Sequence, residues 1–165
     1  METTHITSEE VASGNLEEVC ATFARCFDDP VEHQEARALY ESYAAGRRDF
    51  PAEIPPRTVR LEGYWLHRSG GEAVGISGLY RDCGSLWIGW FGVIESRRRQ
   101  GIGTAIVSGL LAEAAQAGER TLRVFTVRDD PRPALFYRGL GFVDCESDAV
   151  DPVVFRVLEA ATPAS

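Results

Sequence analysis

The sequence contains no lysine, and all 17 of its basic residues are arginine. Schiff-base chemistry and phosphate binding by a P-loop both need a lysine, so both are excluded. No stretch approaches the ~20 apolar residues of a membrane-spanning helix. The polar start, residues 1–10, lacks the basic and apolar parts of a secretory signal. We therefore expect a cytoplasmic protein without a membrane partner.

Closely spaced metal ligands are also absent from the sequence. The cysteines and histidines are Cys20, Cys26, Cys83, Cys145, His5, His33 and His67. Metal sites and redox dithiols usually show short spacings such as Cys-x-x-Cys, which do not occur here. We expect ordinary reduced, partly buried thiols, no metal, and no covalent intermediate on cysteine.

The charge of the chain is acidic and unevenly distributed. The formal net charge is −8. Residues 1–50 hold eleven acids and four arginines, a balance of −7, which leaves −1 for the rest. This balance argues against nucleic acid as a main partner, because binding to its backbone needs basic residues that neutralise phosphates. An acidic N-terminal half suits a cationic substrate, although solvated helix faces explain the same acids.

The length and a hydrophobic content of 44% predict a single globular domain over residues 1–165. A first helix is expected after Asn15, with Asn15 as cap and Glu18 reaching back to it. A second helix is expected after the cap Asp29, ending near Gly46. Their apolar residues recur at a spacing of three and four, which predicts that both helices pack on the core.

Strands are expected after a proline-rich connector at residues 51–56. Runs at 59–67, 73–80 and 86–94 are joined by short turns, which predicts antiparallel hairpins. The third run is apolar at both alternating sets of positions, so it is expected to be a central strand covered on both faces. The remaining expected elements are a helix at 101–117, a strand at 121–127, a short helix at 130–139, strands at 142–145 and 153–158, and a loose tail from Ala160.

The most informative stretch joins the third strand to the helix at 101–117. An arginine-rich turn ends at Gly101-Ile102-Gly103, where the helix begins. The first turn of a helix presents unpaired N–H groups and a positive dipole end, and glycine lets a phosphate approach the backbone. The turn is therefore a candidate pyrophosphate site, although a purely structural turn explains the glycines equally well. A dinucleotide-binding motif does not fit, because Ile106 stands where its third glycine belongs.

Two segments resemble the signatures of one enzyme superfamily. Residues 98–103, RRQGIG, resemble the R/Q-x-x-G-x-G/A acyl-CoA signature of the GNAT acetyltransferases. Residues 130–142 resemble the family segment N-x-x-A-x-x-x-Y-x-x-x-G-F. The resemblance covers roughly residues 57–158, and the expected order of elements also matches. It implies a mixed α/β fold, with a mostly antiparallel sheet of about six or seven strands flanked by helices.

The resemblance also implies a reaction and a set of site residues. Acetyl-CoA would be the cosubstrate, and its acetyl group would pass directly to a primary amine of a small molecule. Tyr137 would donate a proton to the departing CoA thiolate. The CoA-binding residues would be the backbone of Phe91, Gly92 and Val93 for the pantetheine arm, and Arg98, Arg99, Gln100, Gly101, Ile102, Gly103 and Thr104 for the pyrophosphate.

The sequence departs from the family pattern at three places. Asp130 replaces an asparagine that contacts the cofactor in the family, and by this resemblance it is also a candidate CoA-binding residue, although a carboxylate would repel phosphates. Pro133 replaces an alanine, which removes one amide near a helix start. The strand at 86–94 carries no acid, so the general base must lie elsewhere, with Glu62, an acid of the helical lobe such as Asp29 or Glu32, or water as the candidates.

The acceptor stays open at this stage. Four aromatic residues could line its pocket or belong to the core: Tyr64, Trp65, Trp87 and Trp90. The alternatives to a small-molecule acetyltransferase are a non-catalytic acyl-CoA-sensing or interaction module, and a transferase acting on a protein N-terminus or on charged tRNA. Relatives often dimerise, so a homodimer is also considered.

Overall fold

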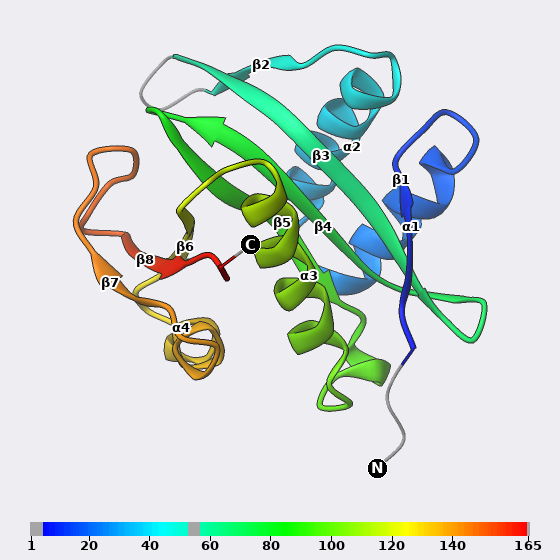
Figure 1. The fold of residues 1–165 in the computed structure, drawn as a ribbon. Helices are drawn as coiled ribbons and strands as arrows, with labels where there is room; N and C mark the ends of the chain where they lie inside the picture. The colour runs from blue at the N-terminus through cyan, green and yellow to red at the C-terminus, as the bar shows by residue number, and fades with distance from the viewer. Residues whose placement is uncertain (1–4, 53–56, 165) are drawn as a thin grey trace.

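The computed structural model describes residues 5–52 and 57–164, and it contains one eight-stranded sheet with helices on both faces (Figure 1). The strand order is β1-β3-β4-β5-β6-β8-β7, and β2 also pairs with β3. The β5–β6 pair is parallel, and the other recorded pairs are antiparallel. The elements are β1 (Thr7–Glu10), α1 (Leu16–Cys26), α2 (Pro30–Ala44), β2 (Asp49–Ala52), β3 (Arg57–Ser69), β4 (Glu72–Asp82), β5 (Ser85–Val93), the 3-10 turn η1 (Glu95–Arg97), α3 (Ile102–Gln116), β6 (Thr121–Val127), α4 (Pro131–Gly139), β7 (Val143–Cys145) and β8 (Phe155–Ala161). The predicted mixed, mostly antiparallel sheet is confirmed.

Each face of the sheet carries its own hydrophobic core. Helices α1 and α2 lie behind the sheet in Figure 1, and α3 and α4 lie in front of it. The rear core includes Phe23, Tyr40 and Tyr64. The front core includes Ile106 and Tyr137. Strand β5 lies near the middle of the order and contributes to both faces, as its two-sided apolar sequence predicts.

The two predicted hairpins have tight turns with positive φ at both central residues. The β3–β4 turn has Gly70 at 59° and Gly71 at 83°, and the β4–β5 turn has Cys83 at 50° and Gly84 at 77°. Such turns match the right-handed twist of the flanking strands and favour glycine. The predicted antiparallel arrangement of β3, β4 and β5 is confirmed.

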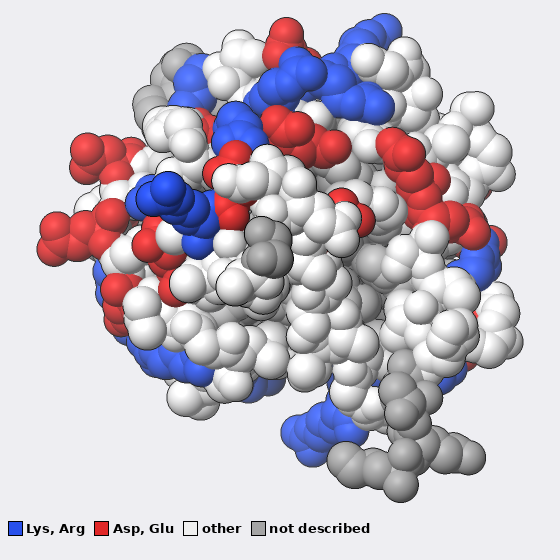
Figure 2. Space-filling model, in the orientation of Figure 1, with Lys and Arg blue, Asp and Glu red and all other residues white. Residues whose placement is uncertain are grey.

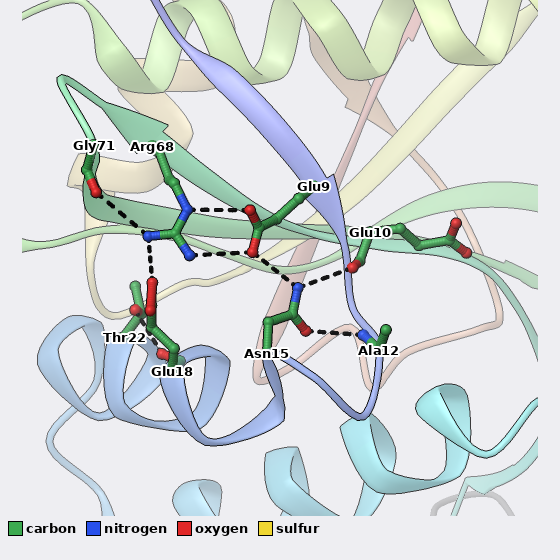
Figure 3. Close-up of polar contacts among 8 residues, drawn as sticks. All are labelled: Glu9, Glu10, Ala12, Asn15, Glu18, Thr22, Arg68 and Gly71. Carbon is green, nitrogen blue, oxygen red and sulfur yellow. Dashed lines mark hydrogen bonds and ion pairs between the residues drawn. The ribbon is translucent and has the colours of Figure 1, made fainter.

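The N-terminal half differs from the prediction in two short strands and one helix cap. Strands β1 and β2 were not expected, so the sheet has eight strands where six or seven were predicted. Strand β2 includes Pro51, which was assigned to the connector; the rest of that connector, at 53–56, lies outside the described residues. Asn15 is the N-cap residue of α1, as predicted, but the predicted side-chain capping interactions do not form. The Asn15 side chain bonds to Ala12 N and Glu9 Oε1, and Glu18 pairs with Arg68 (Figure 3).

The C-terminal segment is ordered further than expected. Strand β8 continues to Ala161, and Thr162 N donates to Arg120 O at 3.0 Å. The Thr162 hydroxyl also donates to Glu119 O at 2.6 Å. The prediction of a loose tail from Ala160 is therefore wrong up to Thr162. Among the helices in the described parts of the chain, none combines the length and apolarity that a membrane crossing requires.

Candidate active site

A bulge in β5 determines which of its side chains face each core. Gly89 pairs with Gly78 and Gly92 pairs with Ile76, so β5 has one residue more than β4 between these pairs. Trp90 lies in the bulge with φ of 43°. Such an insertion shifts the alternation of a strand by one position. Phe91 consequently packs on the front core, while Trp90 packs against Phe23 of α1, with ring centroids 4.8 Å apart.

Strands β5 and β6 diverge immediately after they meet. Their one recorded pair is Trp87 with Arg123. Over the described residues, β5 therefore has no strand partner on its β6 side from residue 88 to residue 93. This stretch includes the backbone of Phe91, Gly92 and Val93, to which the sequence assigned the pantetheine arm. An extended ligand with amide groups can pair with such an open strand edge.

The turn after β5 presents a set of unpartnered backbone donors. Arg99 has φ of 63° and Gly101, the residue before α3, has φ of 80°. The first bond back into the turn runs from Ala105 N to Gly101 O at 3.0 Å. No residue in the described ranges accepts a hydrogen bond from the amides of Arg99, Gly101, Ile102, Gly103 or Thr104. Amides at a helix start in this conformation bind anions.

The three arginines of the turn have different surroundings. Arg97 pairs with Glu72 at 2.5 Å and donates to the Gln100 side chain at 3.1 Å. Arg98 Nε donates to Val93 O at 3.0 Å, and its Nη2 donates to Cys26 O at 3.4 Å. The exposed guanidinium of Arg99 contacts no partner among the residues that the structure describes. Arg98 therefore braces the main chain, and Arg99 is the arginine available to a phosphate.

Tyr137 lies in α4 at the same end of the sheet. Its ring packs against Phe91 of β5 at 6.2 Å and Phe142 at 5.3 Å between centroids. The side chain is buried, and burial raises the pKa of Tyr137 above its usual value. Its hydroxyl has no hydrogen-bond partner within residues 5–52 and 57–164. The phenol is therefore protonated at neutral pH and free to donate to a ligand.

Asp130 acts as the cap of α4, as its sequence context predicts. Its Oδ1 accepts from Arg132 N at 3.1 Å, and it also pairs with Arg132 Nε at 2.9 Å. These hydrogen bonds to Arg132 lower the pKa of Asp130, so its carboxylate is ionised at neutral pH. The local pairing accounts for this residue without a cofactor, and its contact with CoA stays a prediction.

Glu62 is not brought to the turn. It lies in β3 at an irregularity next to Leu61, which pairs with Tyr80 of β4. Tyr80 in turn pairs with Trp87 at the start of β5, whereas the turn follows Val93 at the end of β5. The Glu62 carboxylate lies 3.2 Å from Arg81 Nε. A structural ion pair accounts for it, and its catalytic role stays a prediction.

The connection between α1 and α2 closes over the bulged end of β5, which the sequence did not reveal. A Cβ at Gly92 would lie 2.9 Å from Cys26 Cβ and 3.2 Å from Phe27 Cε2, so this position needs glycine. Burial raises the pKa of the Cys26 thiol to about 11, which makes it a poor nucleophile. Glu32 follows on the first turn of α2. Burial, and then the neighbouring carboxylates, raise the pKa of Glu32.

The four aromatic residues considered for an acceptor pocket divide into two groups. Tyr64 and Trp87 are each 1% exposed and belong to the core. Trp65 and Trp90 are half-buried. The described residues contain no group of three or more His, Cys, Asp and Glu side chains arranged to hold a metal ion.

Comparison with known proteins agrees with this geometry. The family model described as "Acetyltransferase (GNAT) family" matches residues 16–142. An acetyltransferase of that family from Desulfovibrio desulfuricans superposes with a TM-score of 0.73 at 14% identity, covering 96% of this chain and 100% of that one. A GNAT acetyltransferase from Elizabethkingia anophelis with acetyl-CoA bound gives 0.64 at 14% identity, covering 96% and 99%.

An acetyltransferase from Pyrococcus horikoshii gives a TM-score of 0.64 at 20% identity, covering 88% of this chain and 46% of that one. No curated protein sequence matches this chain. The identities to these solved structures are low, so they support the fold alone. The family model covers most of the sequence, including both signature segments. The chain therefore belongs to the GNAT acetyltransferase family.

Proposed function

We propose that this protein transfers an acetyl group from acetyl-CoA directly to a primary amine of a small molecule. One observation carries the proposal: the unpartnered amides at the start of α3 lie beside the open edge of β5, with the free hydroxyl of Tyr137 at the same end. Anion-binding amides suit a diphosphate, and an open strand edge suits the amide-containing arm of CoA.

The residues of the site have separate roles in this mechanism. The amides of 99 and 101–104, with Arg99, hold the diphosphate, and the edge of β5 at Phe91 and Gly92 orients the thioester. The amine nitrogen forms a bond to the carbonyl carbon, and the carbon–sulfur bond breaks. Tyr137 donates its proton to the departing sulfur and regains one from solvent, while the excess proton on nitrogen passes to a base. Positioning supplies most of the acceleration.

Glu32 is the acid that best suits the role of that base. It lies beside the α1–α2 connection, which covers Gly92 at the bulged end of β5. Its raised pKa makes its carboxylate a stronger base than an ordinary glutamate. We expect Glu32→Gln to lower kcat at pH 7 by about tenfold or more. Glu62→Gln should leave kcat unchanged and affect only its ion pair with Arg81. A loss of kcat in Glu62→Gln and not in Glu32→Gln would assign the role of general base to Glu62.

A small amine suits the charge of the acceptor side. Asp28 and Asp29 lie on the connection between α1 and α2, next to Glu32 on the first turn of α2, where these carboxylates attract a cation. The net charge of −8 disfavours tRNA as the acceptor. A protein N-terminus is an acceptor of the same chemistry, and a panel of free amines and peptides separates the two.

Thermal unfolding with acetyl-CoA, combined with a thiol-release assay, tests the proposal. A ligand at a hundred times its Kd adds ~2.7 kcal/mol of stability. Gly101→Val should abolish this gain, because a side chain would enter the phosphate site. Gly46→Val is the matched control, since Gly46 has a similar φ of 86° and equally open surroundings. Stabilisation by acetyl-CoA without release of the CoA thiol in the presence of any amine would indicate an acyl-CoA sensor. The absence of stabilisation would contradict the proposal.

A further inference from the structure

A pocket of about 480 Å³ lies between α3 and the β1–β3 pair. Its lining includes Ile6 and Ser8 near the N-terminus, Trp65 of β3, and Gly109 and Glu113 of α3. In Figure 1, α3 stands between β1 on one side and α4 on the other. The pocket is therefore on the side of α3 away from Tyr137, and the acetyl-transfer site does not use it. Its volume is in the range of small-molecule sites.

The ionisable residues of the pocket lining are His5, His67 and Glu113, and Glu113 supplies its negative charge. Glu113 is the single charged residue of α3. Its exposed carboxylate forms no ion pair or hydrogen bond with any residue in the described ranges. His67, in the pocket wall, is buried and hydrogen-bonded to Ser8 Oγ at 2.8 Å and Ser77 Oγ at 2.7 Å. Burial lowers the pKa of His67 to about 4, so it carries no positive charge at neutral pH.

Apart from Glu113, the α3 side of the pocket is formed by uncharged residues, of which Ala105 and Gly109 are small. Ala105 and Gly109 are exposed on this helix, and the surface over α3 is largely uncharged in Figure 2. A Cβ at Gly109 would meet no atom within 4 Å, so the backbone there borders open space. The half-buried indole of Trp65 supplies an aromatic wall on the opposite side. An apolar group can therefore contact both the helix backbone and an aromatic ring.

The β1 wall is held in place from the other face of the sheet. Arg68 pairs with Glu9 of β1 at 3.1 Å and with Glu18 of α1, and its guanidinium reaches Gly71 O at 3.4 Å (Figure 3). Alternate residues of a strand face opposite sides, so Ser8 faces the pocket while Glu9 faces α1. This bracing keeps the pocket formed without a ligand, which lowers the cost of binding.

We propose that this pocket binds a compact organic cation, with its ammonium group at the Glu113 carboxylate and its apolar body between Trp65 and Gly109. A carboxylate and an aromatic ring together favour an ammonium group, and a neutral His67 does not repel it. The site is separate from the acetyl-transfer site. Binding here does not depend on the function proposed above.

Indole NMR signals of the full-length protein test the proposal directly. The chain has three tryptophans, and Trp65→Phe assigns the Trp65 signal. Titration with phenethylammonium should give a saturable shift of that signal. The neutral 3-phenyl-1-propanol should bind about fivefold more weakly or worse, and 3-phenylpropionate should not bind. An unmoved Trp65 signal, or equal binding of the alcohol, would overturn the proposal.

Substitutions in α3 locate the ligand. Gly109→Leu fills the open space and should abolish the shift, while the fold is kept because leucine is a better helix former than glycine. Ser108→Leu adds the same side chain at an exposed position outside the lining and should bind normally. Glu113→Gln should weaken binding about fivefold. Retained binding in Gly109→Leu would contradict the assignment.

Two further measurements distinguish this pocket from the acetyl-transfer site and from a dimer interface. Tyr137→Phe should leave the titration unchanged, so failure of the transferase proposal and failure of this one are distinguishable. The alternative occupant of the pocket is a second copy of the chain. A dimer in sedimentation that is lost in Gly109→Leu, without a probe, would make this face an interface and overturn the ligand assignment.

Discussion

At the scale of residues, the site is distinguished by groups that the fold leaves unpaired. The phenol of Tyr137 and the guanidinium of Arg99 have no partner in the described parts of the chain, whereas Arg97, Arg98 and Asp130 all do. The sequence identifies the turn, but it does not show which of Arg98 and Arg99 is left without a partner. That difference depends on where the carbonyl groups of Val93 and Cys26 lie, which is a consequence of tertiary packing.

Tyr137→Phe should lower kcat by ~10²-fold or more and change the Kd for acetyl-CoA little, since the hydroxyl acts on the leaving sulfur. Because burial raises the pKa of Tyr137 above 10, the wild-type rate should show no decline up to pH 9.5. Steady-state kinetics and calorimetry measure the two effects. A variant rate within a factor of two of wild type would remove Tyr137 from the mechanism.

Arg99→Ala should weaken acetyl-CoA binding about five- to tenfold, which is the loss of one partly solvated charge contact with phosphate. Arg47→Ala removes the same charge from another exposed position and should leave the Kd unchanged. Calorimetry at low and moderate salt provides the comparison. Equal effects of the two substitutions would mean that Arg99 acts only through net charge.

At the scale of elements, periodicity predicts α1, α2 and α3, because each has a buried face repeated over two or more turns. Helix α4 is predicted from its cap Asp130 and the proline that follows, and the three hairpin strands are predicted from apolar runs joined by short turns. Strands β1 and β2 escape prediction because each has four residues, with two glutamates in one and a proline in the other. The bulge at Trp90 is not predicted either, because both alternating sets of positions in β5 are apolar. The hydrophobic pattern is therefore the same with or without the bulge.

Gly92→Ala should destabilise the protein by about 1–3 kcal/mol, because the new Cβ would collide with Cys26 Cβ and force α1 away from β5. Gly14→Ala, whose Cβ would meet no atom within 4 Å, is the control on the approach to α1. Urea denaturation gives both free energies of unfolding. Unchanged stability in Gly92→Ala would show that the connection over β5 adjusts freely.

At the scale of the whole molecule, the order of expected elements and the family resemblance correctly predict a mixed α/β fold, but they do not reveal how stability responds to pH. The contribution of His67 is invisible in the sequence, since its burial follows from the pairing of β1 with β3. The same pairing creates the pocket beside α3. Both features depend on a strand that the sequence pattern does not show.

Because burial lowers the folded-state pKa of His67 from 6.5 to about 4, protonation favours the unfolded state. The contribution of His67 to the free energy of unfolding should be present above pH 6.5 and should be lost as the pH drops toward 4. Between pH 7.5 and 4.5 the loss from this residue should be about 2 to 3 kcal/mol. His67→Gln should remove that share of the loss. Urea midpoints of both proteins at the two pH values measure it, and parallel losses would exclude His67.

The borders of the sheet have a consequence for self-association. The outer edge of the thirteen-residue β3 is covered by two strands of four residues each, and the opposite border is β7, with three residues. Borders this short are poor templates for intermolecular strand addition, the route to fibrous aggregates. The long unpaired edge that the described chain retains is that of β5, which lies inside the sheet. Because this edge lies between β5 and β6 and not at a border of the sheet, it suits a thin, chain-like molecule better than the strand of a second protein.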